Sequence, residues 1–567
     1  MRTRDRRGAG RGVQRRRRVR ARVAALLAVL LPVLAACAAI PTSGPVAEGD
    51  ARLSWASTID VLAEGPQVGA QPQEIVQGFL LASSAGFGDD FGVARQYLAP
   101  QARSSWRPLA GIVVAGPLEY SNPQRTQVVL DVPVVARIDA EGRYAQAPPE
   151  ASESVTFDMV RDDAGQWRIA SAPDGVILPE SVVDDQLRST PVFFLSPDEA
   201  YLVPEIRWFP ARNIATSVVK ALLDGPSPWL RDAVTTAVPD GVQLTPEAVY
   251  VDADGVAQVT LGPAPTVLSA DRPLLLAQIE ASLRLLPGVG TVRVQAGQGG
   301  PSLENAVQLA RPTAPSGPVE FIQGDRLVEY GSDGVSAVAG VNPLTGLDAR
   351  YPARDSQGGV RVMLSGPDRL VTVPTVGEDI QTLVTGDELV APSVDRFGWS
   401  WTASRTGGIV AARIGDDNVD VGAEWLDGRI VRALRVSPDA TRIAVVSLGG
   451  DGYSVDVAGI DRDESGTPQQ LGEPVQVGAS LTEATAVVWV GGTTLGVVGR
   501  SGASTALHMV QVGGTTEALP EVADLAAVAG GATVYVGTST GELRRLSGPT
   551  WVTVSGVQDA SYPYYAG

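Results

Sequence analysis

The first pattern of apolar positions typical of a folded domain begins near residue 72. Its apolar residues recur on one face of a helix, at Ile75, Val76, Phe79 and Leu80. Pro72 suits the first turn of this helix, and a second helix is predicted from about Asp90 through Leu98. Alternating apolar and polar residues then predict strands at 127–135, 154–160 and 166–170, the last two joined by a turn at 162–165. Two helices followed by an antiparallel sheet make a small α+β domain.

A second set of helices and strands follows a strand predicted at 192–195. A helix with a one-face apolar stripe is predicted from Asn213, and it ends at Asp224-Gly225-Pro226, where the glycine can adopt a left-handed cap. A hairpin is predicted around the turn 253–255. A second striped helix begins at Pro273, and a strand is predicted at 291–295. These elements predict a second compact α+β domain.

From Gly317 onward the chain shows no amphipathic helix pattern. Short valine-rich runs alternate with turn residues, and similar segments recur about every 40 to 50 residues, at 396–403, 436–446, 487–498 and 532–537. This period is typical of four-stranded blades and predicts a β-propeller of about five or six blades. The predicted fold class is therefore multidomain, α+β and all-β, with two small α+β domains followed by a β-propeller.

An uncharged apolar run near the N-terminus predicts export. Residues 1–22 hold 11 arginines and one acid, and residues 23–36 carry no charge. This is the layout of a secretory signal, and the run is shorter than the roughly 20 residues of a spanning helix. Leu34-Ala35-Ala36-Cys37 resembles the lipobox of bacterial lipoproteins, because small residues admit a peptidase and Cys37 offers a sulfur for a diacylglyceryl thioether. We predict cleavage between Ala36 and Cys37 and a lipid on Cys37; an ordinary export signal is the alternative.

Charge and composition narrow the possible partners. The chain has 567 residues and a formal net charge of −18, which becomes about −28 without residues 1–36. Such an acidic chain is a poor binder of nucleic acid. Cys37 is the only cysteine, so an intramolecular disulfide is excluded. Lys220 and His508 are likewise the only residues of their types, which leaves basic chemistry to arginine.

The sequence shows no recognisable catalytic or cofactor site. His508 lies in a predicted strand without a G-x-S-x-G motif, so we interpret it as an ordinary strand residue. One histidine and one lipidated cysteine cannot form a usual zinc site, and Lys220 lies outside a Walker A loop. Asp252-x-Asp254-Gly255 has Val256 where a calcium loop needs its third ligand, so a hairpin turn is favoured. We therefore predict no metal, no cofactor and no enzyme activity.

Two interpretations of the propeller stay open at this point. Opposed carboxylates on a propeller can cleave glycosides, but a large acidic protein offers many such pairs and none is singled out. Phe397, Trp399 and Trp401 either line a carbohydrate or protein groove or pack between blades, and packing is the favoured interpretation.

The chain resembles the actinobacterial lipoprotein family LpqB over nearly its whole length. The resemblance rests on segments 34–45, 75–80 and 94–98, on segments 221–226, 278–283 and 287–294 that are similar to a GerMN domain, and on propeller segments 391–396 and 437–439. Ala440 departs from the glycine usual after Ser437-Pro438-Asp439. The resemblance implies an extracytoplasmic accessory protein that acts with the sensor histidine kinase MtrB, whose regulator MtrA influences cell-wall homeostasis and division. It implies no catalytic residues.

Together these predictions give the chain six parts. They are a lipoprotein signal peptide (1–36), a lipidated Cys and flexible tether (37–71), an N-terminal α+β domain (72–187), a GerMN-like domain (188–305), a linker (306–317) and a β-propeller (318–567). The predicted function is a non-enzymatic regulator of an MtrB-like kinase, lipid-anchored on the extracytoplasmic face of the cell membrane. The alternative is a carbohydrate-binding or glycan-cleaving envelope lipoprotein that uses the propeller face.

Overall fold

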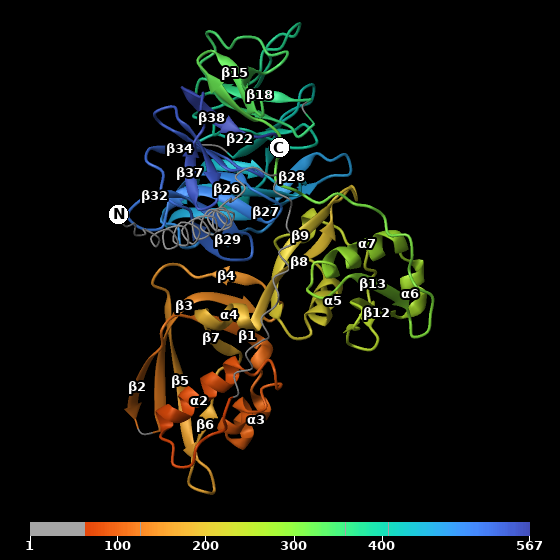
Figure 1. Cartoon of the computed structure of the whole chain (residues 1–567), viewed down its shortest axis with the longest axis vertical. Helices are drawn as coiled ribbons and strands as arrows, with labels where there is room; N and C mark the ends of the chain where they lie inside the picture. The colour runs from red at the N-terminus through yellow and green to blue at the C-terminus, as the bar shows by residue number, and fades with distance from the viewer. Residues whose placement is uncertain (1–62, 125, 358, 406–407) are drawn as a thin grey trace, which may run out of the picture. The chain divides into compact units, whose positions relative to one another are not determined.

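The computed structural model describes residues 63–567, apart from residues 125, 358, 406 and 407 (Figure 1). The predicted signal peptide, Cys37 and most of the predicted tether lie outside the described residues. Asp60–Gly567 group as one unit. This unit contains two α+β regions followed by a β-propeller, which confirms the predicted fold class.

The N-terminal region is a seven-stranded sheet that packs against helix α2 (Pro72–Ser84). Its strands are β1 (Gly111–Ala115), β2 (Glu119–Gln124), β3 (Gln127–Asp139), β4 (Tyr144–Gln146), β5 (Ser152–Arg161), β6 (Trp167–Ser171) and β7 (Val176–Pro179). The other helical segments are η2 (Ala94–Tyr97), α3 (Pro100–Ser105), η3 (Pro108–Ala110) and α4 (Glu180–Gln186). The face of α2 predicted to be apolar is buried in the core beneath this sheet, so the predicted helix is confirmed.

The helix predicted from Asp90 is wrong. Asp90 and Phe91 have φ angles of 55° and 60°, in the left-handed region that an α-helix cannot include. Asp89 Oδ2 accepts a hydrogen bond from the Val93 amide at 2.9 Å, and only the short 3₁₀ helix η2 follows. Phe91 is 2% exposed and makes an edge contact with the Trp106 ring. Burial of this one ring therefore overrides the helical pattern of its neighbours.

Residues 64–70, which the sequence assigns to the tether, are bound to the N-terminal region. The Tyr97 hydroxyl donates a hydrogen bond to the Glu64 carbonyl at 2.8 Å, and the Gly69 amide donates one to Gln166 Oε1 at 2.7 Å. Ala70 packs against the hydrophobic core of the same region. The described end of this segment is thus part of the N-terminal fold.

The middle region joins a long hairpin to a four-stranded sheet and three α-helices. The hairpin is β8 (Leu187–Leu195) with β9 (Leu202–Pro210), and the sheet holds β10 (Gln243–Leu244), β11 (Tyr250–Val251), β12 (Val256–Gly262) and β13 (Thr291–Ala296). The helices are α5 (Ile214–Asp224), α6 (Ala264–Ser269) and α7 (Arg272–Leu283), with a 3₁₀ turn η4 (Arg231–Ala233). Gly225, at φ 87°, ends α5 as predicted, and Asp271 caps α7 by accepting from the Leu274 amide at 3.1 Å. Strand β9 and helix α6 were not predicted.

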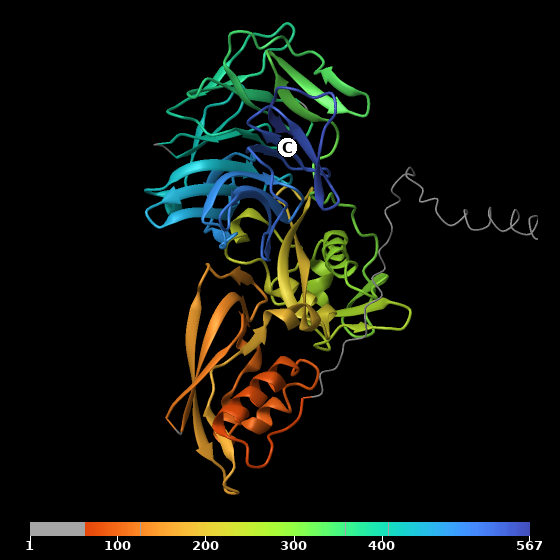
Figure 2. The same ribbon diagram turned by 60° about the vertical axis from the view of Figure 1, so that its left-hand side comes forward.

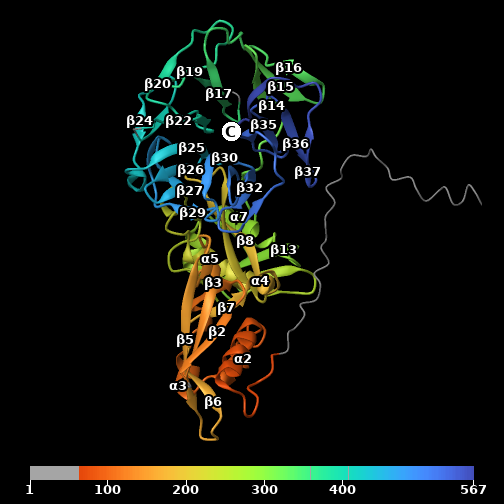
Figure 3. The same ribbon diagram turned by 90° about the vertical axis from the view of Figure 1, so that its left-hand side faces the viewer.

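The remainder of the chain forms six antiparallel sheets, which Figure 3 shows arranged in a ring as the blades of a propeller. Blade 1 contains β38 (Ala560–Tyr564), β14 (Val319–Gln323), β15 (Arg326–Gly331) and β16 (Gly334–Ala337). Blade 2 contains β17 (Ala349–Arg354), β18 (Arg361–Ser365), β19 (Arg369–Thr372) and β20 (Thr382–Thr385). Blade 3 contains β21 (Ser393–Val394), β22 (Ser400–Ala403), β23 (Ile409–Ala412) and β24 (Val419–Val421).

Blade 4 has an additional short strand and follows the 3₁₀ turn η5 (Glu424–Leu426). Blade 4 contains β25 (Ile430–Val436), β26 (Arg442–Gly449), β27 (Gly452–Arg462), β28 (Pro468–Leu471) and β29 (Val475–Val477). Blade 5 contains β30 (Glu483–Trp489), β31 (Thr494–Arg500), β32 (Thr505–Gln511) and β33 (Thr516–Ala518). Blade 6 contains β34 (Leu525–Ala529), β35 (Tyr535–Thr538), β36 (Leu543–Ser547) and β37 (Thr550–Thr553). In each blade, strands adjacent in the sheet are also adjacent in sequence, except at blade 1 and between β27 and β29.

A buried turn in blade 4 accounts for the departure at Ala440. Asp439 is fully buried, and its Oδ1 accepts hydrogen bonds from the Ser437 hydroxyl at 2.6 Å and the Thr441 amide at 2.9 Å. Burial opposes ionisation of Asp439, but the Arg442 ion pair and these hydroxyls outweigh it and lower the pKa of the carboxyl. Ala440 has a φ of 62°, the conformation for which glycine is the usual residue. The carboxyl network thus holds an alanine in the left-handed conformation.

The ring closes where the last strand, β38, pairs with the first propeller strand, β14. Glu320 of β14 is 1% exposed and pairs with Arg354 at 2.9 Å and with Arg361, which lie on β17 and β18 of the next blade. It also accepts a hydrogen bond from the Tyr564 hydroxyl of β38. Glu320 therefore links both ends of the propeller sequence to blade 2. We call Glu320, Arg354, Arg361 and Tyr564 the closure cluster.

Neutralising the carboxylate at this junction should open the ring. We expect Glu320→Gln to lower the unfolding free energy by about 3 kcal/mol, because two half-buried arginines lose their buried counter-charge. The measurement is the urea midpoint followed by tryptophan fluorescence, together with the rate at which carboxypeptidase removes residues of β38. Glu329→Gln on neighbouring strand β15, where the carboxylate only meets Ser336 at 3.5 Å, is the control and should change little. Equal midpoints and digestion rates for the two variants would show that closure does not depend on Glu320.

Candidate functional site

His508 lies in strand β32 and is 1% exposed. Its Nε2 lies 2.9 Å from the hydroxyl of Ser501. Burial lowers the pKa of His508, so the ring is neutral at pH 7. Within the described part of the chain, no carboxylate hydrogen-bonds to this ring, so the pair lacks the third group that orients a catalytic histidine. The position agrees with the interpretation of His508 as a strand residue.

The aromatic segment of blade 3 is packed inside the propeller. Trp399 and Trp401 are 1% and 0% exposed. Asp395 accepts hydrogen bonds from Trp401 Nε1 at 2.9 Å and from Arg462 Nη2 at 2.6 Å, and the Phe397 ring lies 4.0 Å from the Arg396 guanidinium. These side chains support blade packing and do not line a groove.

The candidate acidic motifs form turns. Asp252 Oδ1 accepts hydrogen bonds from the Asp254 and Val256 amides at 3.0 and 2.9 Å, which makes the predicted hairpin turn. Residues 63–567, where described, contain no group of three or more His, Cys, Asp or Glu side chains that could hold a metal ion. Cys37 and Ala36, the predicted lipidation and cleavage residues, lie outside this part of the chain.

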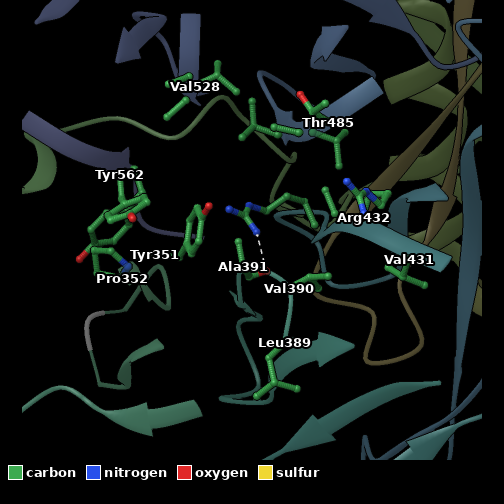
Figure 4. A pocket seen from close by; sticks show the side chains of 18 of the residues that line it. Tyr351, Pro352, Leu389, Val390, Ala391, Val431, Arg432, Thr485, Val528 and Tyr562 are labelled. Carbon is green, nitrogen blue, oxygen red and sulfur yellow. Dashed lines mark hydrogen bonds between the residues drawn. The ribbon is translucent and has the colours of Figure 1, made fainter. Parts of the chain in front are cut away.

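A cavity of about 440 Å³ lies where the first strands of the blades converge (Figure 4). Strands β38, β17, β21, β25, β30 and β34 contact their neighbours around a ring, and residues on or next to each of them line the cavity. We call it the axial cavity. In Figure 4, Tyr351 and Tyr562 lie on one side of it, and Thr485 and Arg432 lie on the other.

Five of the six inner strands direct one residue each toward this cavity through a shared irregularity. In five of the six blades the register of the inner strand shifts by a β-bulge, at 350–353, 431–433, 484–486, 525–527 and 561–564. In the sixth, Glu388 precedes β21 with a φ of 46°. Bulges re-aim side chains and leave backbone groups outside the ladder. The resulting cavity residues form what we call the bulge ring: Tyr351, Glu388, Arg432, Thr485, Ala526 and Tyr562.

The axial cavity has a cationic floor and an aromatic wall. Arg435 Nη1 donates hydrogen bonds to the carbonyls of Ala391 and Pro392 at 3.2 and 3.0 Å, and burial lowers the pKa of Arg435 to about 10, so it stays charged at neutral pH. Tyr351 and Tyr562 have ring centroids 4.3 Å apart and positive φ angles of 46° and 53°. Bulky residues adopt this conformation only where the surrounding structure holds them there.

Comparisons with known proteins match all three regions. Residues 65–184 match the family model described as lipoprotein LpqB, N-terminal domain, and residues 325–566 match the lipoprotein LpqB beta-propeller domain. Residues 191–299 match the Germane model, described as sporulation and spore germination.

Three relatives share most of their length with this chain, and each is named Lipoprotein LpqB. The protein of Cutibacterium acnes is 29% identical over 82% of this chain and 84% of its own. That of Streptomyces coelicolor is 29% identical over 88% of both chains, and that of Streptomyces avermitilis is 27% identical over 94% and 96%. Over most of its length the chain is thus similar to the lipoprotein LpqB family.

Similarity to the LpqB family implies a membrane-associated envelope lipoprotein, and that family is not a known enzyme family. None of the described helices is both long and apolar enough to cross a membrane. Among solved structures, a chain of the nidogen/laminin complex aligns with 44% of this chain and 98% of its own at 12% identity and a TM-score of 0.32, a likeness that carries no functional argument.

Sequence reasoning missed the axial cavity of the propeller. The available signals were two Tyr-Pro pairs, at 351–352 and 562–563, and the arginines at 432 and 435. Each pair is unremarkable by itself, and the separation of more than two hundred residues conceals that the two tyrosines meet. Closure of the ring is what brings them together.

The buried imidazole gives the stability of this protein a measurable pH dependence. The pKa of His508 is lower in the folded than in the unfolded chain, so stability is complete above the unfolded pKa of about 6.5 and falls below it, by at most about 1.4 kcal/mol per pH unit. His508→Gln should remove this part of the slope in urea unfolding at pH 7.5, 6.5 and 5.5. Ser501→Ala keeps the imidazole and should retain the slope. An unchanged slope in the glutamine variant would contradict the assignment.

Proposed function

We propose that this chain is a lipid-anchored, extracytoplasmic accessory protein that regulates an MtrB-like two-component sensor kinase without catalysing a reaction. The observation that carries the proposal is the match to lipoprotein LpqB over most of the chain. The lipobox-like Leu34-Ala35-Ala36-Cys37 supports the anchor. The relation to a kinase and to cell-wall homeostasis and division rests on the resemblance to the LpqB family.

A lipid anchor would serve this function by confining the protein near a membrane partner. Confinement raises the effective concentration of the two proteins without adding a contact between them. One acyl chain binds a membrane only marginally, so the two chains of a diacylglyceryl group on Cys37 matter for stable anchoring. The proposal therefore assigns signalling efficiency to the anchor and specificity to the folded domains.

The side-chain chemistry supports a role in binding rather than catalysis. The Ser501–His508 pair is buried at its histidine and has no orienting carboxylate among the described residues. Asp395 and Asp439, two buried acids of blades 3 and 4, are engaged by arginines and backbone amides, as structural acids are. Burial of Trp399 and Trp401 makes these two rings inaccessible to a carbohydrate ligand.

Removing the thiol should abolish anchoring. We expect Cys37→Ser to accumulate as an unlipidated precursor that leaves the detergent phase in Triton X-114 partitioning, because the hydroxyl does not form the thioether. The measurement is incorporation of labelled fatty acid in cells. Ser43→Ala, six residues beyond the cysteine, is the control and should label normally. Labelling of the serine variant would exclude Cys37 as the lipid site.

The partner is tested by direct binding. The purified full-length protein in mild detergent should capture the extracytoplasmic domain of an MtrB-like kinase, and chelator should leave the affinity unchanged because binding uses protein surface. In cells, Cys37→Ser should weaken kinase output more than it weakens binding in solution. An unrelated sensor-kinase ectodomain is the control. Absence of kinase binding, with hydrolysis of cell-wall glycans lost on one Asp or Glu substitution, would favour the glycan-cleaving alternative.

A further inference from the structure

We propose that the axial cavity binds a small hydroxylated anion, in which a carboxylate or phosphate group is carried by a body with the size and polarity of a sugar. The proposal rests on the charges that face the cavity, on the groups that stay exposed along its wall and on its volume. It concerns binding alone and is independent of the kinase partner proposed above.

The charges facing the axial cavity favour an anion. The charged residues of its lining are three arginines and one carboxylate, Glu388. Glu388 is paired with one of these arginines, Arg405, so the pair adds no net charge. Among the described residues, neither Arg432 nor Arg435 forms an ion pair with a carboxylate. The lining thus keeps two positive charges without a counter-ion, in a chain whose net charge is −18.

The two unpaired arginines keep donors that no protein group uses. Arg435 is held at the cavity floor by hydrogen bonds from Nη1 to three backbone carbonyls, those of Ala391, Pro392 and Leu434. Its Nε and Nη2 donate to no group in the described part of the chain, and the exposed Arg432 guanidinium likewise donates to none there. Guanidinium donors bind carboxylate and phosphate oxygens through charge-assisted hydrogen bonds. An oxyanion group at the cavity floor therefore meets donors that the fold leaves open.

The accessible part of the cavity wall is mainly polar. Six aliphatic residues of the lining are buried and present little surface to a ligand; they are Leu389, Val390, Val431, Val487, Val488 and Val528. The exposed residues of the bulge ring are Tyr351, Glu388, Arg432, Thr485 and Ala526, and all but the last carry a polar group. An apolar ligand gains little from such a wall, whereas a ligand with hydroxyls finds hydrogen-bond partners on it.

The uncharged polar groups of the wall suit ligand hydroxyls. The Thr485 hydroxyl donates its proton to the Val498 carbonyl at 3.3 Å, so its oxygen can still accept a hydrogen bond. The hydroxyls of Tyr351 and Tyr562 bond to no other described group, and each can donate and accept. Tyr351 is 40% exposed, so its ring also offers a face to the C–H groups of a ligand (Figure 4). Hydroxyl partners beside an aromatic face match a sugar-like body.

The volume of the cavity requires more than a bare ion. A volume of about 440 Å³ lies in the range of small-molecule sites. A phosphate or carboxylate group alone fills a small part of it and leaves Thr485 and the tyrosines of the bulge ring without contact. A sugar-sized body that carries the anionic group reaches both the arginine floor and this wall.

The test compares sugar anions with a neutral sugar and a bare anion on the full-length protein in mild detergent. The probes are glucose 6-phosphate, glucuronate, glucose and inorganic phosphate, measured by isothermal titration calorimetry at one ionic strength. We expect at least one sugar anion to bind with a Kd on the order of 0.1 to 1 mM. Glucose and inorganic phosphate should each bind at least about tenfold more weakly, because glucose lacks the charge-assisted pair and phosphate lacks the hydroxylated body. The tighter of the two sugar anions identifies the anionic group as phosphate or carboxylate.

Two variants locate the site, and a third is the control. Arg432→Gln should weaken the sugar anion about tenfold and leave glucose unchanged. Ala526→Trp adds a ring at an exposed position of the bulge ring and should block the sugar anion while keeping the melting temperature. Arg326→Gln removes an exposed arginine of β15, outside the cavity lining, and should have no effect.

Three outcomes would overturn the proposal. The first is equal binding of glucose and the sugar anions, or no binding of either sugar anion up to about 10 mM. The second is binding that is unchanged in both Arg432→Gln and Ala526→Trp, which would place the ligand outside the axial cavity. The third is binding of inorganic phosphate as tight as that of both sugar anions, which would show that the wall contributes nothing to recognition.

Discussion

The propeller depends on one antiparallel pairing, between the first strand β14 and the last strand β38. This pairing completes blade 1, and Glu320 lies buried at the point where it meets blade 2. A buried carboxylate between two arginines is costly to leave unpaired, so it selects the strand register that brings Tyr564 to it. The axial cavity depends on the same pairing, because β38 supplies Tyr562 to the bulge ring.

Elements with local signals were predictable from the sequence. Helices α2, α5 and α7 combine an apolar stripe with residues that suit their ends, such as Pro72 and Gly225, and these signals act over a single turn of helix. The helix predicted from Asp90 was wrong because its apolar residues do not form one face of a helix. Phe91 is buried against Trp106 by a left-handed turn, and a one-dimensional pattern does not contain that contact.

The functional residues also divide into those with a local sequence signal and those that only the folded structure brings together. A lipobox is four consecutive residues, so Cys37 can be proposed without any fold. Register shifts shape the lining of the axial cavity. Register is a property of two paired strands, so the sequence of a single strand does not reveal it. The repeating segments predicted a propeller, yet the number of blades follows from closure, and only closure places Tyr351 beside Tyr562. Packing between blades was the favoured interpretation of Trp399 and Trp401, and both side chains are buried.

The position of β38 makes closure of the propeller sensitive to the loss of one strand. The strand that lies innermost in blade 1 follows all the other propeller strands in the sequence, so five blades and most of the sixth precede it along the chain. A chain cut short before residue 560 would leave β14 with an open edge, and exposed strand edges pair readily with other chains. The order of strands along this sequence thus makes self-association through β14 the expected consequence of losing β38.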